Sequence, residues 1–279
     1  MGLSRKSSRS VQSLLTVVFV LVLGAVLAVK AYSLVDVYRE YKAVEQLLPE
    51  LPVFRLGTQQ RPSNFPAIWL QRVDGIERAV LMAPHYKGME IDVVYNAAAD
   101  LFDVGHPPVP SQGISLDRLF ASIPQVEDHF FWIDFKNLTE NNKQAACQRL
   151  VTTARKYGIV RHMIVESPAP KALACFNENG FYTSYYVFPE LRLSSMGRQQ
   201  ITEYYREIKA NLVASKVNAL SSTYFSLPFI EKYFPDADIL TWYAEPRSRR
   251  LRYYASLAYL RLQPHVKVIL VDQWSPGYR

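Results

Sequence analysis

Two short runs, MEIDVVY at residues 89–95 and FFWIDF at residues 130–135, show the pattern that decides the fold. Both are rich in β-branched and aromatic residues and are apolar on both of the faces that a strand presents, which is typical of a strand covered on two sides. Six similar runs follow the same description, at residues 67–73, 163–166, 182–187, 219–225, 237–244 and 266–272. The sequence therefore predicts eight strands.

Helical patterns lie between these runs. Ser115 is a candidate N-cap for an apolar face over residues 116–123, and similar faces occur at residues 146–154, 201–212 and 251–258. Doubly buried strands that alternate with amphipathic helices predict a parallel sheet covered by helices. Eight units in about 210 residues fit a (β/α)₈ TIM barrel, which we place at residues 67–279. A doubly wound open sheet is the alternative, but the phosphate-binding glycine motifs common in that fold are absent.

The N-terminus carries a membrane signal. Residues 14–29 (LLTVVFVLVLGAVLAV) contain no charge, and an extension to residues 11–35 gives a helix long enough to cross a bilayer. Arg5, Lys6 and Arg9 precede the run, which predicts a cytoplasmic N-terminus and a barrel on the periplasmic or extracytoplasmic side. We expect a tail and anchor at residues 1–35 and a stalk or linker at residues 36–66. The helical spacing of Val37, Tyr41, Val44 and Leu48 indicates either a stalk helix or a helix that covers the underside of the domain. A cleaved signal peptide is the alternative, although no clean cleavage site follows.

Composition excludes several classes of protein. The chain has 279 residues, of which 49% are hydrophobic and 20% charged, so it is neither disordered nor collagenous. The net charge of +7 includes +4 from residues 1–35, which leaves 28 basic against 25 acidic residues elsewhere. This small remainder does not indicate a nucleic-acid partner. Cys147 and Cys175 match no zinc or redox spacing, and we favour two buried free thiols over a disulfide.

Acidic side chains mark a candidate cation site. Glu90 and Asp92 are two residues apart on one strand, so both point to the same face, and Asp134 and Lys136 repeat this spacing on the next. Three carboxylates could converge as ligands for one Ca²⁺ or Mg²⁺ ion, with Lys136 near a phosphate oxygen. The alternative is a metal-free network in which Lys136 and Arg72 pair with the acids.

Only one of the five histidines is placed for chemistry. His85, His129, His162 and His265 precede strands, at the face of a barrel that serves stability. His106 follows the strand-like stretch LFDV and should lie at the carboxyl-terminal rim, where barrel enzymes carry their active sites.

The order of these residues resembles the glycerophosphodiester phosphodiesterase family, one of the phospholipase-C-like phosphodiesterases; menorin-like proteins share similar motifs. The residues that carry the resemblance are Arg72, the run Gly88-Met89-Glu90-Ile91-Asp92-Val93, the run Phe102-Asp103-Val104-Gly105-His106-Pro107, and Ile133-Asp134-Phe135-Lys136. The resemblance implies metal-assisted cleavage of a phosphodiester. It implies metal ligation by Glu90, Asp92 and Asp134, phosphate contacts from Arg72 and Lys136, and an acid/base role for His106.

One position departs from this pattern. The family's second acid/base histidine is Gln71 here, and glutamine cannot transfer a proton near neutral pH. Glu166 could substitute, a good leaving group could make the second histidine unnecessary, or the barrel could bind a sugar phosphate or lipid headgroup without cleaving it. Trp242 is a further candidate site residue.

A barrel glycosidase is the remaining alternative, with Glu90 or Asp134 paired with Glu166. The same-face pair Glu90 and Asp92 favours the metal-dependent reaction over this one. The partners predicted from sequence are a lipid bilayer and a phosphodiester small molecule or headgroup.

Overall fold

The computed structural model describes residues 19, 20, 24, 28, 31–57, 64–187, 193–242 and 250–272. Its strands are β1 (Ile68–Leu70), β2 (Gly88–Asn96), β3 (Leu101–Val104), β4 (Phe130–Phe135), β5 (Met163–Ser167), β6 (Tyr182–Tyr186), β7 (Ala219–Thr223), β8 (Asp238–Trp242) and β9 (Val266–Val271). Its longer helices are α2 (Ile76–Met82), α3 (Leu116–Ser122), α4 (Lys143–Lys156), α5 (Ala174–Glu178), α6 (Arg198–Ala214), α7 (Leu227–Tyr233) and α8 (Arg250–Arg261), together with residues 31–47.

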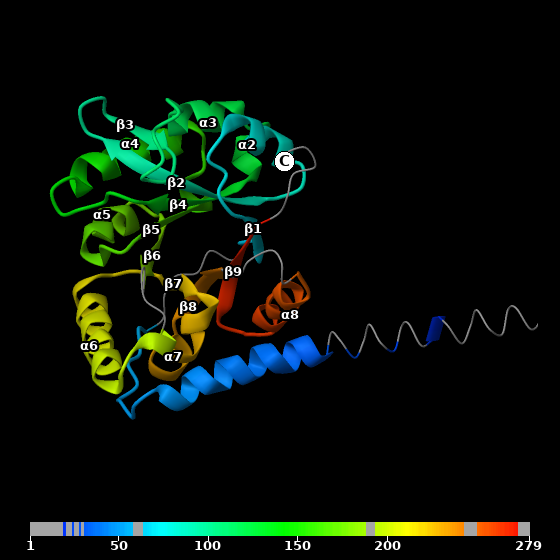
Figure 1. Ribbon diagram of the computed structural model, residues 1–279. Coiled ribbons are helices and arrows are strands. Elements are labelled where there is room, and N and C mark those ends of the chain that lie inside the picture. The colour runs from blue at the N-terminus through cyan, green and yellow to red at the C-terminus, as the bar shows by residue number, and fades with distance from the viewer. Residues whose placement is uncertain are drawn as a thin grey trace, which may run out of the picture.

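The sheet closes on itself. Strand β1 pairs in parallel with β9 on one side and with β2 on the other, and β2 and β4 to β9 pair in parallel in succession. Helices surround the resulting ring of eight parallel strands (Figure 1). The predicted TIM barrel is therefore confirmed, and the open doubly wound sheet is wrong.

Strand β3 stands outside this ring. It pairs antiparallel with the second half of β2, from Val93 opposite Val104 to Asn96 opposite Leu101. The chain then turns at Gly105, whose N–H donates to the carbonyl oxygen of Asp92 at 2.9 Å. This hairpin brings the residue after Gly105, His106, next to the acidic strand.

Large apolar side chains fill the lower part of the barrel. The cluster consists of Trp69, Trp132, Ile164, Tyr182, Ala219, Leu240, Val268 and Leu270. Gly88 is required at its edge, since a Cβ atom there would lie 2.3 Å from the Trp69 ring. The acidic residues thus sit above a packed apolar floor.

All four predicted helices are present. The Ser115 hydroxyl accepts a hydrogen bond from the N–H of Arg118 and caps α3, as expected. Gly158 follows α4 with φ +71°, the left-handed conformation that a helix-ending glycine supplies. Helices α2, α5 and α7 were not predicted, because five to seven residues are too few to show a helical period.

Residues 31–57, most of the predicted stalk, pack on the barrel. Helix 31–47 crosses the outside of α7 and α8 (Figure 1) and buries Val37, Val44 and Leu48. The Tyr224 hydroxyl donates to the carbonyl oxygen of Val37 at 3.0 Å. Beyond the helix, Tyr233 donates to the Pro49 carbonyl oxygen. This part of the chain belongs to the outer layer of the barrel.

Most of the apolar run at residues 14–29 lies outside the described residues. Among the helical residues that are described, none forms a helix both long enough and apolar enough to cross a membrane.

Cys147 and Cys175 form a disulfide, with their Cα atoms 6.2 Å apart. The interpretation as two free thiols is therefore wrong. Its physical reason is that α4 and α5 pack against each other, so that residues 28 positions apart in sequence meet.

Candidate functional site

Three carboxylates converge at the carboxyl-terminal half of the barrel. Strand β2 supplies Glu90 and Asp92, and β4 supplies Asp134, which is the register partner of Asp92. One oxygen from each residue lies within 4.8 Å of the others. Glu90 and Asp92 are 3% and 1% exposed. The structure thus brings together the three residues predicted as cation ligands.

The ammonium group of Lys136 lies among these three carboxylates. Its Nζ lies 2.7 Å from Oδ1 of Asp92 and forms a second, very short contact with Asp134. Of the metal-free network considered above, the pairing of Lys136 with the acids is therefore observed. The pairing of the Arg72 side chain is not observed: Arg72 contacts Glu90 through its backbone N–H, 2.6 Å from Oε2, and its side chain is exposed.

The carboxylates outnumber the ammonium group. Burial raises the pKa of Glu90 well above its usual value, and the neighbouring Asp92 and Asp134 charges raise it further. Burial likewise raises the pKa of Asp134, although Lys136 opposes this effect. Oδ2 of Asp92 is buried and makes no hydrogen bond with the residues that the structure describes. Three carboxyl groups therefore share one ammonium group, and one ligand atom is unsatisfied.

Asp74, which the sequence pattern does not single out, completes the acidic cluster. Its Oδ1 accepts the backbone N–H of Asp92 at 3.1 Å. Burial and the Asp92 charge raise the pKa of Asp74 to about 7. The sequence feature that could have identified Asp74 is its position four residues after the end of β1, on the rim where the functional loops of a barrel lie.

His106 lies on the rim beside the cluster. It is exposed, and its Nδ1 lies 2.5 Å from the carbonyl oxygen of Pro107. Because a carbonyl oxygen can only accept, Nδ1 carries the proton and Nε2 remains free to accept one. A charge on His106 also contributes to lowering the pKa of Asp134, after the larger effects of burial and Lys136.

Gln71 and Trp242 occupy the ends of their strands. Gln71 directly follows β1, two residues after the interior side chain of Trp69, and therefore shares its side of the strand. The Gln71 backbone is held by Val271 and by Arg78. Trp242 is half-buried at the end of β8 and packs its ring 6.4 Å from that of Trp132.

Glu166 lies in the same layer of the barrel as the aspartates. The register runs from Asp92 to Asp134 to Glu166 to Ser184 across four neighbouring strands. Glu166 is 1% exposed, and the side chains of Ser221 and Trp132 donate hydrogen bonds to its carboxyl group. Burial, with the Asp134 charge adding to it, raises the pKa of Glu166 well above its usual value.

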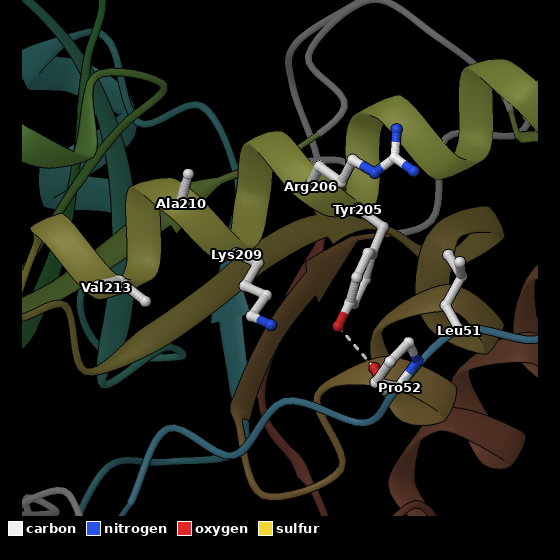
Figure 2. A pocket seen from close by; sticks show the side chains of 7 residues that line it. All are labelled: Leu51, Pro52, Tyr205, Arg206, Lys209, Ala210 and Val213. Carbon is white, nitrogen blue, oxygen red and sulfur yellow. Dashed lines mark hydrogen bonds between the residues drawn. The ribbon is translucent and has the colours of Figure 1, made fainter.

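A separate groove of about 560 Å³ lies on the outside of the barrel (Figure 2). Helix α6 forms one side through Tyr205, Arg206, Lys209, Ala210 and Val213, and Leu51 and Pro52 form the other. The Tyr205 hydroxyl donates to the Pro52 carbonyl oxygen at 2.6 Å across it. None of the predicted site residues lines this groove, which is the seam between α6 and the segment after helix 31–47.

The chain is similar in structure to phosphodiesterases with the same barrel. A glycerophosphodiester phosphodiesterase from Parabacteroides distasonis has 14% sequence identity and a TM-score of 0.49, with 74% of this chain and 92% of that one covered. An Oleispira antarctica phosphodiesterase in complex with the product sn-glycerol-3-phosphate has 11% identity and a TM-score of 0.48, with 74% and 92% covered.

A calcium-dependent phosphoinositol-specific phospholipase C from a Pseudomonas species has 9% identity and a TM-score of 0.45, with 76% of this chain and 92% of that one covered. No protein-family model and no curated protein matches the sequence.

Proposed function

We propose that this chain is a divalent-cation-dependent phosphodiester hydrolase of the phospholipase-C-like type. One observation carries the proposal: Glu90, Asp92 and Asp134 offer converging oxygens, with Lys136 among them, at the end of a TIM barrel where catalytic residues lie. The order of motifs in the sequence supports the same conclusion.

The residues present fit a hard divalent cation. Carboxylate oxygens are the ligands that Ca²⁺ and Mg²⁺ prefer, and Oδ2 of Asp92 lacks a partner among the described residues. Glu90, Asp92 and Asp134 would hold one such ion. When bound, it would supply charge neutralisation for a phosphate group.

The chain's own residues account for orientation and for one proton transfer. The ammonium group of Lys136 lies beside Asp92 and Asp134. With a divalent cation bound by the carboxylates, this ammonium group would be free to bind a phosphate oxygen. His106 accepts the proton of the attacking hydroxyl or water at Nε2, because Nδ1–H is held by Pro107. Attack forms the new P–O bond, and the bond to the leaving alcohol breaks.

Gln71 limits the leaving step. The departing oxygen needs a proton, and a glutamine in place of the second histidine cannot supply it. We therefore infer that phosphodiesters with good leaving groups, which need no proton, are cleaved much faster than alkyl phosphodiesters. Binding of a headgroup without turnover is the second candidate function, and the same substitution favours it.

We further propose that the barrel is exported and anchored by residues 14–29. The disulfide supports export, because structural disulfides persist in oxidising compartments. The basic residues before the apolar run support the orientation.

The test compares the wild-type protein with Gln71→His. We expect turnover of bis(4-nitrophenyl) phosphate with Ca²⁺ or Mg²⁺ and none with EDTA. Gln71→His should raise the rate on an alkyl phosphodiester by about 10²–10⁴, the usual contribution of one general acid or base. His106→Ala serves as the loss-of-function control. Turnover that survives EDTA, or that is unchanged in His106→Ala, would contradict the proposal. Absence of turnover in both proteins would leave the binding function.

A further inference from the structure

Helix α8 carries positive charge and no acidic residue. Its sequence, RLRYYASLAYLR, contains Arg250, Arg252 and Arg261, and no Asp or Glu occurs between Glu245 and Asp272. The Arg261 side chain is exposed and forms no salt bridge with any residue that the structure describes. A basic surface of this kind is suited to an anionic partner.

Helix α4 provides a contrast within the same barrel. It also has basic and no acidic residues, but Arg149 and Lys156 both pair with Asp117 of α3. The charge of α4 is thus partly neutralised by a neighbouring element, whereas Arg261 of α8 has no such acid among the described residues. The basic side of α8 therefore has charge available for a partner outside the chain.

Aromatic and aliphatic side chains are exposed next to this charge. Tyr254 of α8 is 62% exposed, and Leu262, directly after the helix, is 79% exposed. The start of helix 31–47 exposes four more: Tyr32, Leu34, Val35 and Tyr38. Exposed tyrosines and aliphatic residues beside arginines are typical of protein surfaces at the headgroup level of a bilayer.

Helix 31–47 connects this surface to the apolar run at residues 14–29. The helix begins on the α8 side of the barrel (Figure 1), and the ring centroid of its Tyr41 lies 5.7 Å from that of Tyr259 on α8. From this contact back to residue 31 the helix extends about 15 Å, at about 1.5 Å per residue. The headgroup layer of a bilayer is itself about 5–8 Å thick on each side. A bilayer crossed by residues 14–29 would therefore lie within reach of α8.

We propose, resting on the anchoring proposed above, that α8 and the start of helix 31–47 dock on an anionic lipid surface. The arginines of α8 attract the lipid phosphates, and Tyr32, Tyr38 and Tyr254 lie at the headgroup level. Continuity with the apolar run favours a bilayer over an acidic protein as the partner. The anchor and α8 together hold one side of the barrel against the membrane, so that the barrel does not rotate freely on a linker.

The attraction comes from α8 and not from helix 31–47. Helix 31–47 has two basic and three acidic residues: Arg39, Lys42, Asp36, Glu40 and Glu45. Substitutions in α8 alone therefore test the electrostatic part of the proposal.

Site-specific fluorescence of the full-length protein in vesicles tests the orientation. The two cysteines of the chain are joined in a disulfide, so that an introduced cysteine is the single free thiol for a bimane label. Ala258→Cys places the label at an exposed position of α8, and Arg155→Cys places it at an exposed position of α4, across the barrel (Figure 1). The vesicles contain phosphatidylcholine, phosphatidylglycerol and a lipid with a nitroxide on its headgroup. We expect quenching of the label at residue 258 and only background quenching at residue 155.

Charge variants with the label at residue 258 test the role of the arginines. Arg252→Gln combined with Arg261→Gln should lower the ratio of docked to undocked barrels by about 25-fold, since each basic residue near an anionic surface contributes about fivefold. Phosphatidylcholine vesicles without phosphatidylglycerol should likewise reduce the quenching. Arg118→Gln combined with Arg155→Gln removes two exposed arginines from α3 and α4 and should leave the quenching unchanged.

Two results would overturn the proposal. One is equal quenching at residues 258 and 155, and the other is quenching at residue 258 that neither the substitutions in α8 nor the removal of phosphatidylglycerol reduces. If the protein floats with the vesicles in those cases, the anchor stands and only this inference fails. If the protein does not float with the vesicles, the proposed anchoring fails with it.

Discussion

At the residue scale, the aspartates of this barrel differ in role according to the groups that surround them. Asp92 and Asp134 are register partners on the neighbouring strands β2 and β4, and both contact the ammonium group of Lys136. Asp238 lies at the opposite end of the barrel and accepts a hydrogen bond from the Tyr182 hydroxyl at 2.8 Å. Only the first pair combines converging oxygens with an unsatisfied atom, and for this reason we assign the cation there.

Sequence spacing predicted part of this site. Glu90, Asp92, Asp134 and Lys136 were identified because two-residue steps place strand side chains on one face. Asp74 was not, since an aspartate in a loop occurs in many proteins without a role. Its significance depends on its contact with Asp92 on another element, which one strand's pattern does not contain.

His129 gives a pH-dependent prediction at the same scale. It is buried before β4, with Nδ1 donating to the Tyr86 carbonyl oxygen at 3.2 Å. Burial, and secondly the charge of Lys87, lowers the pKa of His129 below its ordinary value of 6.5, while Asp128 and Glu127 act in the opposite direction. The unfolded chain therefore binds more protons than the folded chain below pH 6.5, so that stability is lost as the pH falls.

His129→Asn removes the titrating group and retains a donor for Tyr86. The difference in free energy of unfolding between wild type and variant should shrink as the pH falls from 7.5 to 5. Urea denaturation at several pH values measures it. A difference that stays constant over this range would refute the assignment of the acid sensitivity to His129.

At the scale of the element, strands were more predictable than helices. All eight barrel strands were identified from apolar runs, because a buried strand is apolar on both faces over its whole length. Strand β3 was recognised only as strand-like, and α2, α5 and α7 were missed, since each is a single turn or two. Closure of the barrel depends on β1, which has only three residues in the sheet yet pairs on both sides.

The close contact between β1 and β2 predicts that Gly88 cannot be replaced by a larger residue without loss of stability. A Cβ atom on Gly88 would overlap the Trp69 ring, which is fully buried in the barrel interior. Gly88→Ala should therefore lower the free energy of unfolding by at least about 2 kcal/mol, in the upper part of the range for overpacking. Gly197→Ala is the control, because its Cβ would meet only the Gln200 side chain at 3.8 Å. Similar denaturation midpoints for the two variants would disprove the tight approach.

At the scale of the whole molecule, the barrel and the segment before it form one packed unit. From the sequence, residues 36–66 are expected to form a stalk or linker, with a helix that covers the underside of the domain as the alternative. The structure buries Val37, Val44 and Leu48 of this segment against the barrel, in agreement with the alternative. The residues that contact this segment, among them Tyr224, Glu231 and Tyr233, lie about 180 to 190 residues further along the chain. Local sequence patterns therefore cannot reveal these contacts.

Truncation tests this integration. A chain beginning at residue 58 should be less stable than one beginning at residue 31 by several kcal/mol, since each buried aliphatic side chain contributes about 1.5–3 kcal/mol. Thermal melting followed by circular dichroism compares the two chains. Equal melting temperatures would show that residues 31–57 are a dispensable linker after all.

The central claim is that Glu90, Asp92 and Asp134 hold one divalent cation. Calorimetric titration of Ca²⁺ and Mg²⁺ into the full-length protein tests it most directly, with Asp92→Asn as the site variant and Glu127→Gln as the control. We predict saturable binding of one ion per chain in the wild type and the control, and its loss in an Asp92→Asn protein that circular dichroism shows to be folded. No saturable binding to the folded wild type, or unchanged binding in Asp92→Asn, would contradict the account.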